Sequence, residues 1–174
     1  VDEPATLDGI ASSMLRLGAL TGAAGAAEAA ATYRAAIARL RDRYASRAEV
    51  RVFYQVWPQP LLTLNGRHLV SDVLALCGGR NVFADLDALV PPVSTEAVLA
   101  ADPQVIVTTD DTIADPVALW RQWPRLRAVQ AGTVYSLSSD LVTRASPRLA
   151  EGVEVTCRAL DRAREVYRRR APPR

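Results

Sequence analysis

Short apolar runs alternate with helical patterns after residue 48, and this alternation constrains the fold more than any other feature of the sequence. Residues 50–57 are rich in β-branched and aromatic side chains and end at Pro58, which predicts a strand. The Val-Ile-Val run at 105–107 and the segment 133–137 predict two more strands. Strands that alternate with helices pair in parallel through right-handed crossovers. We therefore expect an α/β lobe of three layers, with a parallel central sheet flanked by helices.

Helical patterns fill the intervals between these strands. Apolar residues recur at helical spacing over 69–77, and the two glycines that follow are a typical helix stop. Ser94 is suited to cap a short helix, and Ser146 followed by Pro147 favours the start of the last one. The helices expected in the lobe are therefore 69–77, 94–99, 116–122 and one that begins at Ser146-Pro147.

Residues 1–46 differ from the rest because they predict helix alone. Thr6 or Asp8 can cap a helix over about 7–20, and Gly22 can end it. A second helix is expected over 26–44, where Tyr33, Ile37, Leu40 and Tyr44 form one apolar stripe. At about 1.5 Å per residue, this helix is roughly as long as a small domain is wide. We expect residues 1–46 to form a leading helix and a long connector helix, and residues 47–174 to form the lobe.

The sequence argues against most kinds of enzyme and against nucleic-acid binding. It holds no Lys, which excludes the lysine-containing phosphate loop, and no Gly-x-Ser-x-Gly turn. The net charge of +2 is too small for a nucleic-acid footprint, and a single histidine, His68, makes a zinc site improbable. We expect no catalytic residues, no metal and no catalytic cofactor. Asp110 and Asp111 are the best carboxylate pair, and an α/β enzyme built on them stays open as an alternative.

Four segments in fixed order resemble periplasmic substrate-binding proteins of the helical-backbone class, and among these the cobalamin (vitamin B12) binders of ABC importers. They lie at 52–63, 76–83, 93–107 and 139–148. The helix at 26–44 is similar to the family's rigid connector between two lobes. The resemblance implies that residues 47–174 are the C-terminal lobe, that the N-terminal lobe is absent from this sequence, and that cargo lies between the lobes.

The resemblance also implies which residues hold the cargo. Trp57 ends a strand before Pro58 and can face the cleft, although a Trp under the connector helix would serve the core instead. Asp140 and Arg144 match a pair that contacts corrin amides, although an exposed i, i+4 ion pair explains the same spacing. Cobalamin binders can carry a Trp where this sequence has Val90. The expected ligand-binding residues are Tyr54, Val56, Trp57, Val90, Pro91, Asp140 and Arg144.

The remaining implications concern partners and location. Glu96 matches a carboxylate that docks on the membrane subunits of the importer, so contact with the membrane would occur only through that permease. Cys77 and Cys157 could by themselves be two buried thiols or one bridge. The resemblance implies a bridge, which in turn implies an oxidising, periplasmic location. A haem or ferric-siderophore carrier of the same fold, or an interaction or sensor domain without transport, are the alternatives to cobalamin binding.

Overall fold

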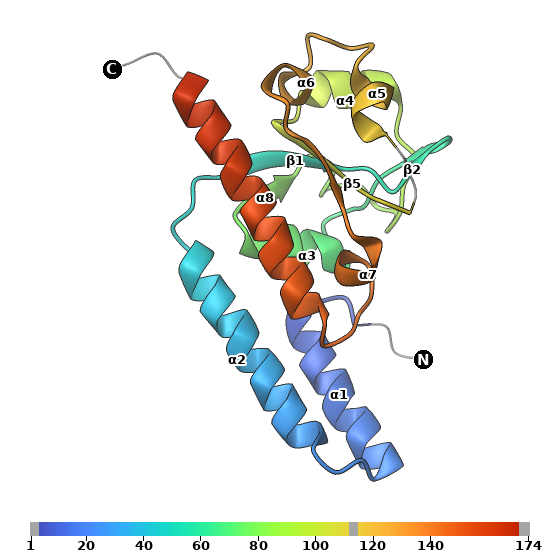
Figure 1. The fold of residues 1–174 in the computed structure, drawn as a ribbon. Helices are drawn as coiled ribbons and strands as arrows, with labels where there is room; N and C mark the ends of the chain where they lie inside the picture. Colours follow the sequence, from blue (N-terminus) through green and yellow to red (C-terminus); the bar gives the residue numbers. More distant parts are fainter. Residues whose placement is uncertain (1–3, 112–114, 171–174) are drawn as a thin grey trace.

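The computed structural model describes residues 4–111 and 115–170 (Figure 1). The elements follow one another in the order α1 (Leu7–Thr21), α2 (Ala26–Tyr44), β1 (Val50–Tyr54), β2 (Trp57–Pro58), β3 (Leu61–Leu62), α3 (Leu69–Leu76), β4 (Gly79–Asn81), α4 (Thr95–Ala101), β5 (Val105–Thr109), α5 (Pro116–Trp120), α6 (Arg127–Ala131), β6 (Val134–Leu137), α7 (Ser139–Val142) and α8 (Leu149–Arg170). Among the described residues, no helix combines the length and apolarity that crossing a membrane would require.

The central sheet confirms the expected architecture. Its four strands stand in the order β4-β1-β5-β6, and every neighbouring pair is parallel. A separate antiparallel hairpin joins β2 to β3. Because the side chains of a strand point alternately to the two faces of the sheet, β1 contributes to two cores at once.

Helices cover both faces of the sheet, which makes three layers. Val52 and Tyr54 of β1 face a large core closed by α1, α2, α3 and α8, whereas Phe53 faces a smaller core. In the smaller core, the Phe53 ring meets that of Trp120 from α5 edge to face, with ring centroids 5.7 Å apart. Figure 1 shows α4, α5 and α6 together on that side of the sheet and α3 and α8 on the other. The α/β prediction is confirmed.

The first two helices form an antiparallel pair that extends away from the sheet (Figure 1). The hydroxyl of Thr6 accepts a hydrogen bond from the Gly9 amide and caps α1, and Gly22 ends it in the left-handed conformation. Ile10 and Ile37 are buried between the pair and the lobe, whereas Leu20 near the free end is 82% exposed. Both predicted helices are confirmed, with ends at or within one residue of those expected.

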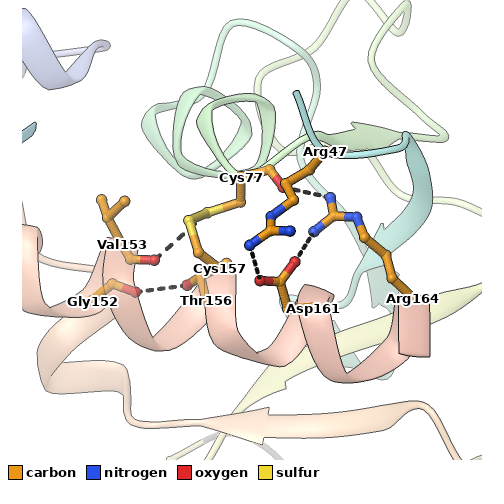
Figure 2. The surroundings of a disulfide bond; sticks show 8 residues. All are labelled: Arg47, Cys77, Gly152, Val153, Thr156, Cys157, Asp161 and Arg164. Carbon is orange, nitrogen blue, oxygen red and sulfur yellow. Dashed lines mark hydrogen bonds and ion pairs between the residues drawn. A yellow bond between two sulfur atoms is a disulfide. The ribbon is translucent and has the colours of Figure 1, made fainter. Parts of the chain in front are cut away.

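A disulfide between Cys77 and Cys157 ties the end of α3 to the middle of α8 (Figure 2). Beside it, the guanidinium of Arg164 donates to the carbonyl oxygens of Cys77 at 2.6 Å and Ala48 at 2.7 Å. The carboxylate of Asp161 pairs with Arg164 at 2.7 Å and with Arg47 at 3.4 Å. The predicted bridge is confirmed, and Arg164 also satisfies a carbonyl that the end of α3 would leave without a partner.

Several predicted boundaries were wrong, and each has a local cause. The strand expected over 50–57 stops at Tyr54, because the Val56 amide donates to Leu62 of the hairpin instead of to the main sheet. The last helix begins at Leu149, two residues after the predicted Pro147. The predicted helix at 116–122 ends at Trp120. Strand β4 and helix α6 were not predicted, since they are only three and five residues long.

Candidate functional site

The C-terminal edge of the sheet carries the predicted site. Because all four strands are parallel, their C-terminal ends lie together, which is where open α/β sheets place ligands. β1 leads into the β2–β3 hairpin, β4 into the segment 82–92, β5 into Asp110 and Asp111, and β6 into α7. Figure 1 shows β2 and α7 on the same side of the lobe. The topology therefore brings the Trp57 hairpin and the Asp140 helix to one edge.

Trp57 presents an aromatic surface on the hairpin. Its side chain is 45% exposed, and its indole Nε1 donates to the Gln59 carbonyl oxygen at 3.1 Å. This bond satisfies the only polar group of the indole and fixes the ring edge against the hairpin backbone. The exposed face of the ring is thus a fixed, apolar surface suited to stacking on a flat ligand.

Tyr54 and Val56, which precede Trp57 by three residues and one residue, are less accessible. Tyr54 is 4% exposed, and burial, with a smaller contribution from the Asp111 carboxylate, raises the pKa of its phenol. Val56 is half-buried and packs against the larger core. Tyr54 also packs into the larger core, and direct ligand contact by Tyr54 and Val56 stays a prediction.

The segment 82–92 forms a second part of the edge, and backbone hydrogen bonds to residues 61–63 hold its C-terminal end in place. The Thr63 amide donates to the Pro91 carbonyl oxygen at 3.1 Å, and the Val93 amide donates to Leu61 at 2.9 Å. Val90 is 40% exposed, whereas Pro91 is buried. Of the two residues predicted to contact ligand here, only Val90 offers substantial surface, and the role of both stays a prediction.

The Asp140–Arg144 pair lies on and just after α7. Their side chains form an ion pair of 3.3 Å with exposed fractions of 65% and 74%, so both charges are open to solvent. Asp110 belongs to the same corner, where its Oδ1 accepts a hydrogen bond at 2.9 Å from the Ser139 amide at the start of α7. This bond caps the start of α7, the helix that bears Asp140. Because it gives the Asp110 carboxylate a structural role, it weakens the alternative that Asp110 is a catalytic residue.

A hollow of about 450 Å³ opens beside Arg144. Arg67 and Arg144 are part of its lining, together with the apolar side chain of Leu89. The His68 Nδ1 accepts from the Val70 amide at 3.1 Å, so His68 caps α3. The full lining is Pro4, Ala5, Arg67, His68, Leu69, Leu89, Thr143, Arg144 and Ala145.

Sequence reasoning missed Arg67, Leu89 and Thr143 as parts of this hollow. They lie far apart in the chain and belong to no motif, so only the fold brings them together. Among the described residues, no group of three or more His, Cys, Asp or Glu side chains is placed to hold a metal ion. Two arginines and several apolar residues line the hollow instead. This combination suits an organic ligand with hydrogen-bond acceptors on its rim.

Glu96 lies in the first turn of α4, the helix that follows the segment 82–92. It is exposed, and its helix is capped by the Ser94 hydroxyl, which accepts from the Ala97 amide at 3.1 Å. The predicted cap is confirmed. A carboxylate at a helix N-terminus is favoured by the helix dipole, so its position is stable whether or not it meets a partner.

A parallel α/β lobe that brings the Trp57 hairpin, the segment 82–92 and α7 to one edge has the arrangement in which open α/β sheets place ligands. The family model described as periplasmic binding protein matches residues 1–141. The chain belongs to this family. A vitamin B12-binding protein of Vibrio cholerae is 42% identical over 131 residues, which are 75% of this chain and 47% of that protein. One from Yersinia pestis is 38% identical over 135 residues, covering 76% of this chain and 46% of its own.

Solved structures agree with these relatives. The crystal structure of a periplasmic vitamin B12-binding protein of Vibrio cholerae superimposes with a TM-score of 0.85 at 38% identity, covering 93% of this chain and 64% of the other. A periplasmic heme-binding protein from Roseiflexus sp. RS-1 superimposes with a TM-score of 0.83 at 21% identity, covering 92% and 65%. The second likeness shows the fold alone. The chain spans about half the length of the curated relatives it matches.

Proposed function

We propose that this chain belongs to a periplasmic substrate-binding protein that carries cobalamin, or a related corrinoid, to an ABC importer and catalyses no reaction. The observation that carries the proposal is the 42% identity to a vitamin B12-binding protein over three quarters of the chain. In structural superposition the identity is 21% to the heme-binding protein and 38% to the vitamin B12-binding protein, which favours cobalamin over haem as cargo.

In the proposed complex, the C-terminal edge of the sheet forms one wall of the ligand cleft. The exposed face of Trp57 stacks on the apolar face of the corrin ring, which needs a flat partner. Asp140 and Arg144 exchange hydrogen bonds with the amide groups on the rim of the ring, one as acceptor and one as donor. Tyr54, Val56, Val90 and Pro91 complete the wall around these three.

We further propose that residues 1–46 provide the leading helix and the backbone helix between two lobes, and that residues 47–174 form the C-terminal lobe. The length and stiffness of α2, 19 residues, suit a connector that limits relative motion of the lobes. A second lobe of the protein supplies the opposite wall of the cleft. Periplasmic location agrees with the buried Cys77–Cys157 bridge, which is stable in an oxidising compartment.

Glu96 is the proposed docking residue for the membrane subunits of the importer. It is exposed in the first turn of α4, so its carboxylate is accessible to a cationic partner. The variant E96R should lose uptake of cobalamin by cells while its affinity for cobalamin stays unchanged. Equal loss of both would place Glu96 in the ligand site and remove the docking role.

The test of the cargo is calorimetric titration of the protein as encoded, with any residues that precede Val1. Cyanocobalamin, haem and a ferric siderophore are titrated separately against it. Saturable binding of cyanocobalamin, lost in the variant W57A and weakened in R144A, supports the proposal. Binding of haem or of the siderophore with none of cyanocobalamin would replace it by the alternative cargo. Binding of none of the three would leave the interaction or sensor domain.

A further inference from the structure

Asn65 is a buried polar residue whose side-chain hydrogen bonds all connect to backbone groups. It is 1% exposed and lies three residues after the end of β3. Its side-chain amide nitrogen donates to the carbonyl oxygens of Leu86 at 3.0 Å and Asp87 at 3.4 Å. Its side-chain oxygen accepts from the Arg67 amide at 2.9 Å. All polar atoms of this side chain are therefore partnered.

The backbone of Asn65 extends the same connections. Its amide donates to the Leu89 carbonyl oxygen at 3.0 Å. Its carbonyl oxygen accepts from the Ser71 hydroxyl at 2.7 Å and from the His68 amide at 3.3 Å. One residue thus bonds to both the 86–89 stretch and the 67–71 stretch, which otherwise belong to different connections of the fold.

These two stretches are walls of the hollow beside Arg144. Arg67, His68 and Leu69 come from one of them and Leu89 from the other. The guanidinium of Arg67 adds a further bond to the Asp87 carbonyl oxygen, close to the one that Asn65 makes. The segment 86–89 has no helix or strand of its own, so its position depends on the backbone bond from Asn65 to Leu89 and on side-chain bonds of this kind.

We propose that Asn65 is a positioning residue for ligand binding, which joins the 86–91 segment to the 65–69 segment and so sets the width of the hollow and the presentation of Val90. The inference rests on the proposed function for its ligand. An Asn side chain can donate to two carbonyl oxygens and at the same time accept from a backbone amide. An Asp side chain has no N–H donors, and a Ser side chain is too short to make all three bonds.

The test compares N65A with N81A in the protein as encoded. Asn81 is a matched control because it is also buried, at 6% exposed, and donates to the Leu64 carbonyl oxygen at 2.8 Å. Its side-chain oxygen accepts from the Phe83 amide at 2.9 Å, and its amide nitrogen also donates to the Ser71 hydroxyl oxygen at 3.0 Å. The side-chain bonds of Asn81 therefore join Leu64, Ser71 and Phe83, whereas those of Asn65 reach Leu86 and Asp87. Both variants remove an amide that bridges two stretches of backbone, so both should lower the thermal midpoint.

Only N65A should change the site. We expect about tenfold weaker binding of cyanocobalamin, mostly through faster dissociation, because a mobile wall no longer holds the bound ligand. Binding by N81A should stay close to that of the parent protein. N65S is a second variant, since a serine hydroxyl can still accept from the Arg67 amide and preserve the local turn. It should weaken binding as N65A does, because it also loses the bonds to Leu86 and Asp87.

A ligand-free measurement separates this inference from the proposed function. The Thr63 amide donates to the Pro91 carbonyl oxygen, and the Val93 amide donates to that of Leu61. Neither bond involves Asn65, so hydrogen exchange of these two amides reports independently whether the segment 86–91 is held in place. Faster exchange at both in N65A and not in N81A supports positioning, even if the parent protein binds none of the three cargoes. Unchanged exchange in N65A, or equal weakening of cyanocobalamin binding by N65A and N81A, overturns it.

Discussion

Removing the Cys77–Cys157 bridge should cost the lobe a large share of its stability. The two cysteines are 80 residues apart in the chain, and in the loop-closure model a link of that span removes about 4.5 kcal/mol of unfolded-state entropy at room temperature. This corresponds to a factor on the order of 10³ in the folding equilibrium. Both side chains are 0% exposed, so the double variant C77A/C157A also loses buried volume, which adds to the loss.

The assay is urea unfolding followed by tryptophan fluorescence, since Trp120 is 1% exposed in the folded lobe and becomes solvated on unfolding. Three samples are compared: the oxidised protein, the same protein reduced under denaturing conditions and refolded in reductant, and the double variant. Reduction removes the link but keeps both sulfur atoms, so the oxidised and reduced samples isolate the cross-link. A difference between them below about 1 kcal/mol would falsify the entropic account of this bridge.

Three further outcomes follow from the structure. Replacing Ser94 by Ala should lower the free energy of unfolding by about 1 kcal/mol, because the Ala97 amide loses its cap; a loss near zero in urea unfolding would mean that water replaces the hydroxyl. Replacing Asp140 or Arg144 by Ala should change stability by less than about 0.5 kcal/mol, because the pair is exposed, yet weaken cyanocobalamin binding in calorimetry; unchanged binding would leave only a surface ion pair. Burial, helped by nearby carboxylates, raises the pKa of Tyr33 and Tyr54 above the ordinary value of about 10. Their contribution to stability is complete below that pH and is lost as pH rises toward the folded-state values, so tyrosinate absorbance should appear together with alkaline unfolding; tyrosinate from all tyrosines before unfolding would contradict this.

The fold was largely predictable because its long elements carry strong periodic patterns. The stripe of Tyr33 and Ile37 defined α2 to the residue, and the Val-Ile-Val run defined the core of β5. Short elements carry too few residues for a period to appear, which is why β4 and α6 were missed. Val56 was wrongly included in the first strand, because an apolar pattern does not show where the chain leaves the sheet.

The candidate site was predictable only where a family motif exists. The motif led to Trp57, Asp140 and Arg144, and the structure places all three at the C-terminal edge with exposed surface. It did not lead to Arg67 or Asn65, whose importance comes from what they touch in space. For Tyr54, the motif indicated a ligand contact, whereas the structure buries the side chain in the larger core. Strand alternation predicts which face of the sheet the side chain points to, but not whether helices cover that face.

The position of β1 in the sheet has a consequence for how the protein is made. β1 is the first strand of the lobe to be synthesised, yet both strands that pair with it, β4 and β5, come later in the chain. Until they emerge, an apolar Val-Arg-Val-Phe-Tyr segment has two open edges able to join another chain. We therefore expect the nascent lobe to be prone to aggregation at this stage, and we expect a chaperone to bind it at residues 50–54.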